Sequence, residues 1–145
     1  MKLINRRAKF DYTILESFEA GISLKGEEVK ALNLKRGNLA SSFVKIKDQE
    51  AWLLGANIPQ PSQSGSPNYD STRPRKLLLH KKEIISLETK SKQQKLTLIP
   101  LSLYNKGPLI KAQIAFAKGK RQYEKREYLK RKDIEREAQK AFKGY

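Results

Sequence analysis

Leu96 to Tyr104 reads L-T-L-I-P-L-S-L-Y, and Leu109 to Ala117 reads L-I-K-A-Q-I-A-F-A. Both runs are dominated by apolar residues, as strands that face a core are. Asn105-Lys106-Gly107-Pro108 separates them and has the turn chemistry of a hairpin. The sequence therefore predicts two strands joined by a tight turn.

Strand patterns also precede this pair. Phe10 to Ala20 is rich in β-branched and aromatic residues, and Gly21 permits a bulge or turn before the strand resumes. Phe43 to Lys47 alternates and Ala51 to Leu54 returns after a polar turn, which predicts a hairpin. On the first of these strands the spacing places one face inward, made of Tyr12, Ile14 and Phe18.

Two segments have helical patterns. Glu27 to Leu34 begins with two glutamates, which suit the positive end of a helix dipole. Leu77 to Leu79, followed by Lys81 to Lys92, predicts a second helix. Pro59 to Pro74 holds four of the six prolines and predicts a long loop. The expected core-facing residues are Val29, Ala31 and Leu32 on the first helix, and Ile84, Ile85 and Leu87 on the second.

Together these elements predict a mainly β body. About six antiparallel strands with two or three short helices match a closed barrel of the oligonucleotide-binding type. We expect residues 1–117 to form this domain and residues 118–145 to form a separate tail.

The tail, Lys118 to Tyr145, has eleven Lys or Arg against five Asp or Glu. Such a segment buries too little apolar surface to fold alone, but it can become a helix along a polyanion. We therefore expect it to be disordered in the free protein and helical on its partner, with Gly119 as the pivot. Its apolar face would consist of Ile134, Ala138, Ala141, Phe142 and Tyr145.

The whole chain has 31 basic and 15 acidic residues, a formal net charge of +16. Phosphate backbones are the commonest partner of such an excess, because neutralised phosphates release counterions. A membrane is the weaker alternative, since no apolar run approaches the roughly 18 residues of a spanning helix. The chain has no cysteine, and its first residues do not resemble a secretory signal. These features favour a cytoplasmic protein.

Catalytic motifs are scarce. His80 is the only histidine, Glu27 and Glu28 are adjacent and so do not share a helix face, and no phosphate-binding glycine loop occurs. No acidic cluster has metal-ligand spacing. We therefore expect no catalytic residue, metal or cofactor, although a nuclease site assembled in three dimensions stays open as an alternative.

Cations concentrate in three places: Asn5 to Lys9, Arg73 to Lys76 with His80 to Lys82 behind it, and the tail. Three such clusters favour RNA over three solvated surfaces, because basic grooves with stackable rings hold single strands and loops. The candidate rings are Tyr69, Tyr104 and Tyr123, of which Tyr104 is equally compatible with ordinary packing.

Six motifs then resemble one known family in order. They are N-R-R-A-K-F-D-Y from Asn5, the block from Phe18 to Leu32, G-A-N-I-P, T-R-P-R-K-L-L-L, P-L-S-L-Y and A-K-G-K-R-Q-Y-E-K-R. The family is small protein B, the tmRNA-binding protein of bacterial trans-translation. The resemblance implies an oligonucleotide-binding barrel that binds the tRNA-like domain of tmRNA and delivers it to stalled ribosomes.

The resemblance and the basic clusters together indicate site residues. For tmRNA they are Asn5, Arg6, Arg7, Glu19, Arg75, Lys76, Leu78 and Lys111. For the ribosomal decoding centre and messenger channel they are Lys118, Lys120, Arg121, Tyr123, Glu124, Lys125 and Arg126. The expected assembly is one monomer per tmRNA, with elongation factor Tu as a further candidate partner through the RNA. A ribosomal or assembly protein with the same charge is a further alternative, beside the nuclease.

Overall fold

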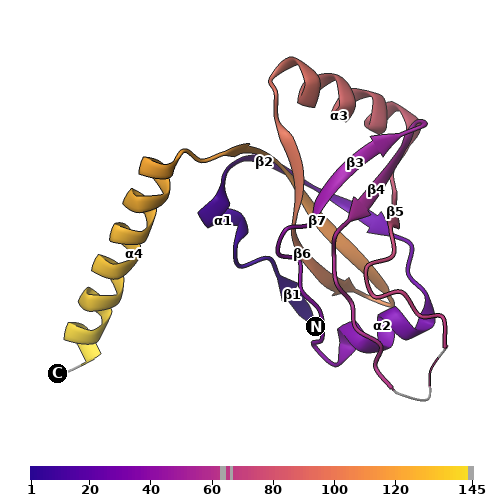
Figure 1. Cartoon of the computed structure of the whole chain (residues 1–145), viewed down its shortest axis with the longest axis horizontal. Helices are drawn as coiled ribbons and strands as arrows, with labels where there is room; N and C mark the ends of the chain where they lie inside the picture. The colour runs from indigo at the N-terminus through magenta and orange to yellow at the C-terminus, as the bar shows by residue number, and fades with distance from the viewer. Residues whose placement is uncertain (63–64, 66, 144–145) are drawn as a thin grey trace.

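The computed structural model describes residues 1–62, 65 and 67–143, and the side chains of residues 122, 123 and 137–143 are not described. Figure 1 shows a body of strands and short helices from which a long helix extends. In chain order the elements are β1 (Lys2–Ile4), α1 (Ala8–Asp11), β2 (Tyr12–Ile22), α2 (Gly26–Asn33), β3 (Phe43–Lys47), β4 (Glu50–Leu54), β5 (Arg75–Leu78), α3 (Lys81–Gln93), β6 (Thr97–Lys106), β7 (Leu109–Gly119) and α4 (Gln122–Lys143).

All strand pairings are antiparallel, in the order β1-β6-β3-β4-β5-β2-β7, and β6 also pairs with β7. The β6–β7 pairing runs from Thr97↔Ala117 to Lys106↔Leu109, which confirms the hairpin expected from the turn residues. The β3–β4 hairpin is confirmed as well, from Phe43↔Leu54 to Lys47↔Glu50. The body is therefore mainly β, as predicted.

One strand is longer than expected. β7 continues to Gly119, where it pairs with Tyr12 at the start of β2. The sheet thus extends two residues beyond the expected limit at residue 117, and Gly119 ends the strand rather than following it.

The core lies between the inward faces of the strands and is closed at one side by α2. Ala31 and Leu32 of this helix are buried with Leu53, Leu103 and other side chains in one cluster, and Val29 packs against it. On α3, Ile84 is buried and Leu87 packs on the core, but Ile85 is 51% exposed. The expectation that Ile85 faces inward is wrong, because α3 covers the sheet with a narrow stripe only.

The expectation that Leu77 and Leu78 belong to the second helix is also wrong. They belong to β5, which pairs with β4 and β2, and α3 begins at Lys81. A short apolar run before a helix fits a buried strand as well as a helical turn. Here the free edges of β2 and β4 supply the strand's hydrogen-bond partners. The three-residue β1 and the four-residue α1 were not predicted.

The tail forms α4 in this structure of the chain alone, whereas the sequence predicts disorder without a partner. Its first turns are supported by α1, through contacts described below. Figure 1 shows that the rest of α4 extends away from the body. Of the predicted apolar face, Ile134 is exposed, and Ala138, Ala141, Phe142 and Tyr145 lie outside the described side chains.

Candidate nucleic-acid interface

Register places four residues from four strands in one row. Leu78 of β5 pairs with Gly21 of β2, Gly21 pairs with Lys111 of β7, and Lys111 pairs with Tyr104 of β6. Directly paired residues point to the same side of a sheet. The chain neighbours Ala20, Ile22, Leu77, Ile110 and Ala112 are buried in the core, so this outer row lies on the outside of the sheet.

Gly21 leaves room for its neighbour in the outer row. A Cβ atom at this position would lie 3.1 Å from the Cβ of Leu78. Leu78 is 55% exposed although it is a large apolar residue. The glycine therefore lets the leucine lie close to β2 and present its apolar surface outward.

Glu19 stands beside the outer row and is held by two donors. Its carboxylate accepts hydrogen bonds from the Tyr104 hydroxyl and from Lys106 Nζ, the latter at 3.0 Å. These bonds, that of Tyr104 first, lower the pKa of Glu19 below its ordinary value. Burial and the same bond raise the pKa of Tyr104 to about 12. The group is therefore an ionised acceptor among cations at neutral pH.

Asn5 is not part of this exposed surface, since only 8% of it is exposed. Its Nδ2 donates to the Pro100 carbonyl at 2.9 Å, and its backbone N–H donates to the Leu101 carbonyl at 2.8 Å. Pro100 lies on β6 between the segment that pairs with β3 and the segment that pairs with β1. The Asn5 amide thus supplies a donor in the gap between two strands.

Arg6 and Arg7 follow Asn5 and are exposed. Arg7 Nε lies 3.3 Å from Asp11 Oδ2, and its guanidinium lies 5.4 Å from the centre of the Phe10 ring. Of the first basic cluster, the two arginines are therefore accessible to RNA and Asn5 is not.

Arg75 corrects the expectation for the second cluster. Its relative exposure is 0%, so it cannot touch RNA in this structure. Its Nε lies 2.6 Å from Glu28 Oε2, and its guanidinium donates to the Ala56 and Ser71 carbonyls at 2.6 and 3.0 Å. Arg75 therefore holds the loop between β4 and β5 onto α2. Its neighbour Lys76 is accessible, with Nζ 3.1 Å from Glu50.

Glu28 is the buried partner in this cluster. Burial alone would raise its pKa, but the Lys25 backbone N–H at 2.8 Å and the guanidinium groups of Arg73 and Arg75 outweigh burial, so the pKa of Glu28 lies below its ordinary value. The sequence offered no signal for this pairing, because Glu28 and Arg75 are 47 positions apart.

The start of the tail lies against α1. Lys120 donates from its backbone N–H to the Asp11 carbonyl at 3.0 Å and from Nζ to the Lys9 carbonyl. Its ammonium lies 4.1 Å from the centre of the Tyr128 ring, and burial lowers the pKa of Lys120. The Tyr128 and Phe10 rings are 6.5 Å apart. These contacts fix the first turns of α4 to the body.

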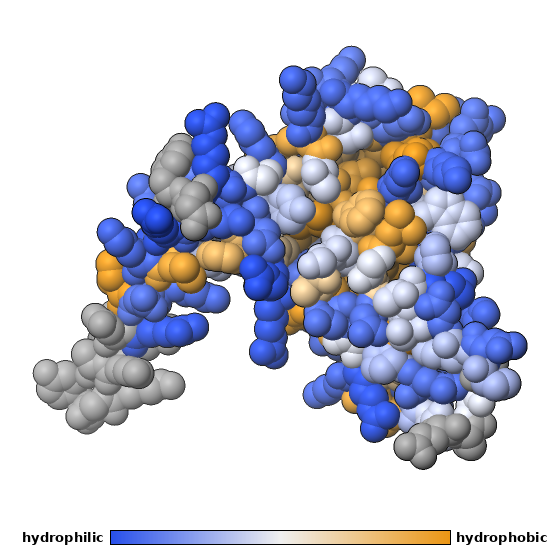
Figure 2. Space-filling view, in the orientation of Figure 1, coloured by the Kyte–Doolittle hydropathy of each residue, from blue (hydrophilic) through white to orange (hydrophobic). Residues whose placement is uncertain are grey.

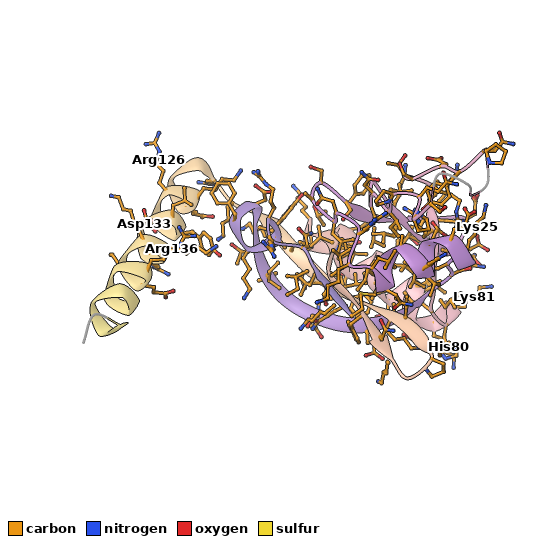
Figure 3. The ribbon with its side chains drawn as sticks, turned by 90° about the horizontal axis from the view of Figure 1, so that it is seen from below. Lys25, His80, Lys81, Arg126, Asp133 and Arg136 are labelled. Atoms are coloured by element: carbon orange, nitrogen blue, oxygen red, sulfur yellow. The ribbon has the colours of Figure 1, made fainter. Side chains whose placement is uncertain are left out.

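The other residues predicted to contact the ribosome lie near the same start of α4. Lys125 Nζ lies 3.7 Å from Asp11 Oδ1, and Glu124 accepts a hydrogen bond from the Arg121 backbone at 3.3 Å. Lys118, Arg121 and Arg126 are exposed. Tyr123 lies in the first turn of α4, with a side chain outside the described set. Figure 3 shows Arg126, Asp133 and Arg136 on α4, at the opposite end of the molecule from His80 and Lys81.

Hydrophilic side chains dominate the face of the molecule that Figure 2 shows. There they cover α3 and much of the coloured part of α4, while apolar groups gather over the body between them. Among the described residues, no cluster of three or more His, Asp or Glu could hold a metal ion. Across the same part of the chain, no helix combines the length and the apolar character of a membrane crossing.

A family model described as SmpB protein matches residues 2–144. The chain belongs to the SmpB family. The SsrA-binding protein of Sulfurihydrogenibium sp. strain YO3AOP1 is 51% identical over 140 residues, which are 97% of this chain and 92% of the relative. That of Thermosipho melanesiensis strain BI429 is 49% identical over 147 residues, or 99% and 100% of the two chains.

A solved structure supports the same family. It is described as "tmRNA-SmpB: a journey to the center of the bacterial ribosome", and its chain is 42% identical to this one with a TM-score of 0.70. The match covers 83% of this chain and 85% of the other. The resemblance to the SmpB family seen in the sequence motifs is therefore confirmed along nearly the whole chain.

Proposed function

We propose that this chain is an RNA-binding adaptor that binds the tRNA-like domain of tmRNA and delivers it to stalled ribosomes for trans-translation. The observation that supports this most is the similarity to SsrA-binding proteins over 97% or more of the chain. The described structure containing both tmRNA and SmpB on the ribosome supports the same two partners. The adaptor acts in the cytoplasm as a monomer and performs no catalysis of its own.

The body is the tmRNA-binding part of this proposal. The pairings β6-β3-β4-β5-β2-β7-β6 return to their start, which supports a closed barrel of the oligonucleotide-binding type. Such barrels bind RNA on their outer strands and loops. Of the residues assigned to tmRNA, Arg6, Arg7, Glu19 and Leu78 are exposed and Lys76 and Lys111 are half-buried, and Asn5 and Arg75 support them from within.

The tail is the ribosome-binding part. It would occupy the empty messenger channel as a helix, with its cations on rRNA phosphates and Tyr123 stacked on a base. Protein and truncated RNA together would then fill the space of a whole tRNA. Peptide transfer itself belongs to the ribosome.

The test is to purify the tagged full-length protein from its own cells and sequence the RNA bound to it. A single dominant tmRNA species is expected. Ribosomal RNA alone, present whether or not ribosomes are stalled, would instead favour a ribosomal or assembly protein. Specific cleavage of the bound RNA would favour a nuclease.

A second measurement tests the division of roles. Deleting residues 122–145 should abolish tagging of stalled chains and leave tmRNA binding intact. A matched variant that keeps the tail and replaces Glu19 by Ala should weaken tmRNA binding and reduce tagging together, because less tmRNA would be delivered. The proposed roles would be wrong if the deletion alone prevented tmRNA binding.

A further inference from the structure

A second surface lies on the outside of β3, β4 and β5. A hollow of about 610 Å³ opens there, with Trp52, Leu54 and Pro74 as its apolar lining and Lys45 and Lys47 at its border. The predictions from sequence assigned no role to β3 or β4.

The register explains why an indole is present outside the core. Lys45 of β3 pairs with Trp52 of β4, and Trp52 pairs with Lys76 of β5. Their chain neighbours Val44, Ala51, Leu53 and Leu77 are buried, so all three side chains point outward. The indole therefore lies between two lysine side chains on the sheet surface.

The charges around the indole favour an anion. Glu50 also borders the hollow, but its carboxylate is already 3.1 Å from Lys76 Nζ. Within the described part of the chain, no ion pair involves Lys45 or Lys47. Against these two lysines the lining adds one further acid, Asp48, at the β3–β4 turn.

This surface is continuous with the candidate interface. Lys76 and Leu78 are two residues apart on β5, so they share its outer side. Leu78 belongs to the outer row, and Lys76 flanks Trp52. An RNA chain that lies on the outer row at Leu78 of β5 would therefore reach the indole on the neighbouring strand β4.

We propose that Trp52 is a stacking platform for an unpaired base of tmRNA, whose neighbouring phosphates contact Lys45 and Lys47. The proposal rests on the proposed tmRNA binding and names a contact within it. A ring flanked by cations on an exposed sheet is how proteins hold unpaired nucleotides without reading sequence. RNA is the occupant that fits, because a purely apolar partner would leave both lysines without a counter-charge.

Trp52 is the only tryptophan in the chain, so its fluorescence reports this site alone. We expect tmRNA to quench the emission of the full-length protein, with the same midpoint as an independent mobility-shift titration. Trp52→Phe should retain affinity within about threefold because it keeps a ring. Trp52→Leu, which keeps apolar bulk without a stacking face, should bind about tenfold more weakly.

Lys45 and Lys47 have a separate test. Replacing both by Gln should make the log–log dependence of affinity on salt shallower by about 1.4, the value for two single-strand phosphates. The control is Lys30→Gln with Lys35→Gln, the same charge change at exposed positions at the end of α2. Thermal melting of each variant verifies that it is folded.

Three results would overturn the proposal that Trp52 is a stacking platform. One is unchanged emission at saturating tmRNA while the mobility shift shows binding, and another is wild-type affinity in folded Trp52→Leu. A third is quenching that requires ribosomes, which would assign the surface to the ribosome. In each case tmRNA binding itself stands. Failure of the wild-type protein to bind tmRNA would instead remove the proposed function.

Discussion

Glu19 and Glu28 both meet cationic side chains, but they lie in opposite surroundings. Glu28 is buried and shared by Arg73 and Arg75, so its charge stabilises the fold. Glu19 is exposed at the outer row, where Tyr104 and Lys106 orient its carboxylate. A carboxylate in that position can accept hydrogen bonds from base or ribose donors, despite its repulsion of phosphates.

For Glu19 we predict that Glu19→Ala lowers tmRNA affinity at moderate salt by about tenfold or more, as expected for losing hydrogen bonds to a charged group. Tyr104→Phe should have a smaller effect, since the carboxylate stays but loses one of its two hydrogen-bond donors. A binding titration with purified tmRNA measures both. Glu16→Ala, an exposed acid on the same strand, is the control, and wild-type affinity in Glu19→Ala would refute the assignment.

For Glu28 we predict loss of stability in Glu28→Ala of about 3–5 kcal/mol, because two arginines lose a buried partner. The folded-state pKa of Glu28 lies below 4.5. The wild-type stabilisation is therefore complete above pH 4.5 and is lost as pH falls through the lowered value. Urea unfolding across this range should show a smaller acid-induced loss in the variant. Equal pH dependence in both proteins would contradict the role of the ionised group.

Asn5 and Arg75 are assigned residues that the structure buries, and neither burial could be predicted from the sequence. Arg75 is in a basic cluster, and only the position of Glu28, 47 residues away, shows that its charge is buried. Asn5 belongs to a family motif, yet its amide bonds to the carbonyl of Pro100, 95 residues away. Glu19 and Leu78, which are exposed, and the half-buried Lys111 lie on one outer surface. Their contacts with RNA stay predictions.

At the scale of elements, long strands joined by a clear turn could be predicted from the sequence, and short elements could not. β6 and β7 are ten and eleven residues long and are joined through Gly107, which has φ = +60°, so their pattern and turn agreed. β5 has four residues and α1 also has four. Elements this short have no period to detect, and their structure comes from the neighbours they pair with.

For α4 we predict that amide protection in the free protein reaches about Tyr128 and then falls to the level of an isolated helix. Up to Tyr128 the helix contacts Phe10 and Asp11, whereas Leu129 and Ile134 are exposed. An unsupported helix of this length is marginal in water. Hydrogen exchange measures the limit, and Tyr128→Ala should move it back toward Arg121.

The matched variant for this experiment is Leu129→Ala, which removes an exposed apolar side chain next to Tyr128. It should leave the limit of protection unchanged. Strong protection beyond residue 136 in the free protein would show that the whole helix forms without the ribosome. Absence of protection from Arg121 onward would show that α1 does not hold α4.

At the scale of the whole molecule, the charge excess should govern how binding responds to salt. With about six phosphate contacts, the log–log slope for tmRNA should be near −4. Truncation after Gly119 removes the cations of α4 and should change this slope little, because the body makes the tmRNA contacts. The slope is measured by titrations at several salt concentrations. A large decrease on truncation would show that the tail also binds tmRNA.

The pairing of β7 with both β2 and β6 has a consequence for biosynthesis. Tyr12 and Gly119 are partners, so the chain cannot complete its sheet until nearly all of it has been translated. Until then β2 and β6 each expose an edge that other strands could join. Because closure of such distant contacts is slow, the newly made protein should be most vulnerable to aggregation just before β7 emerges.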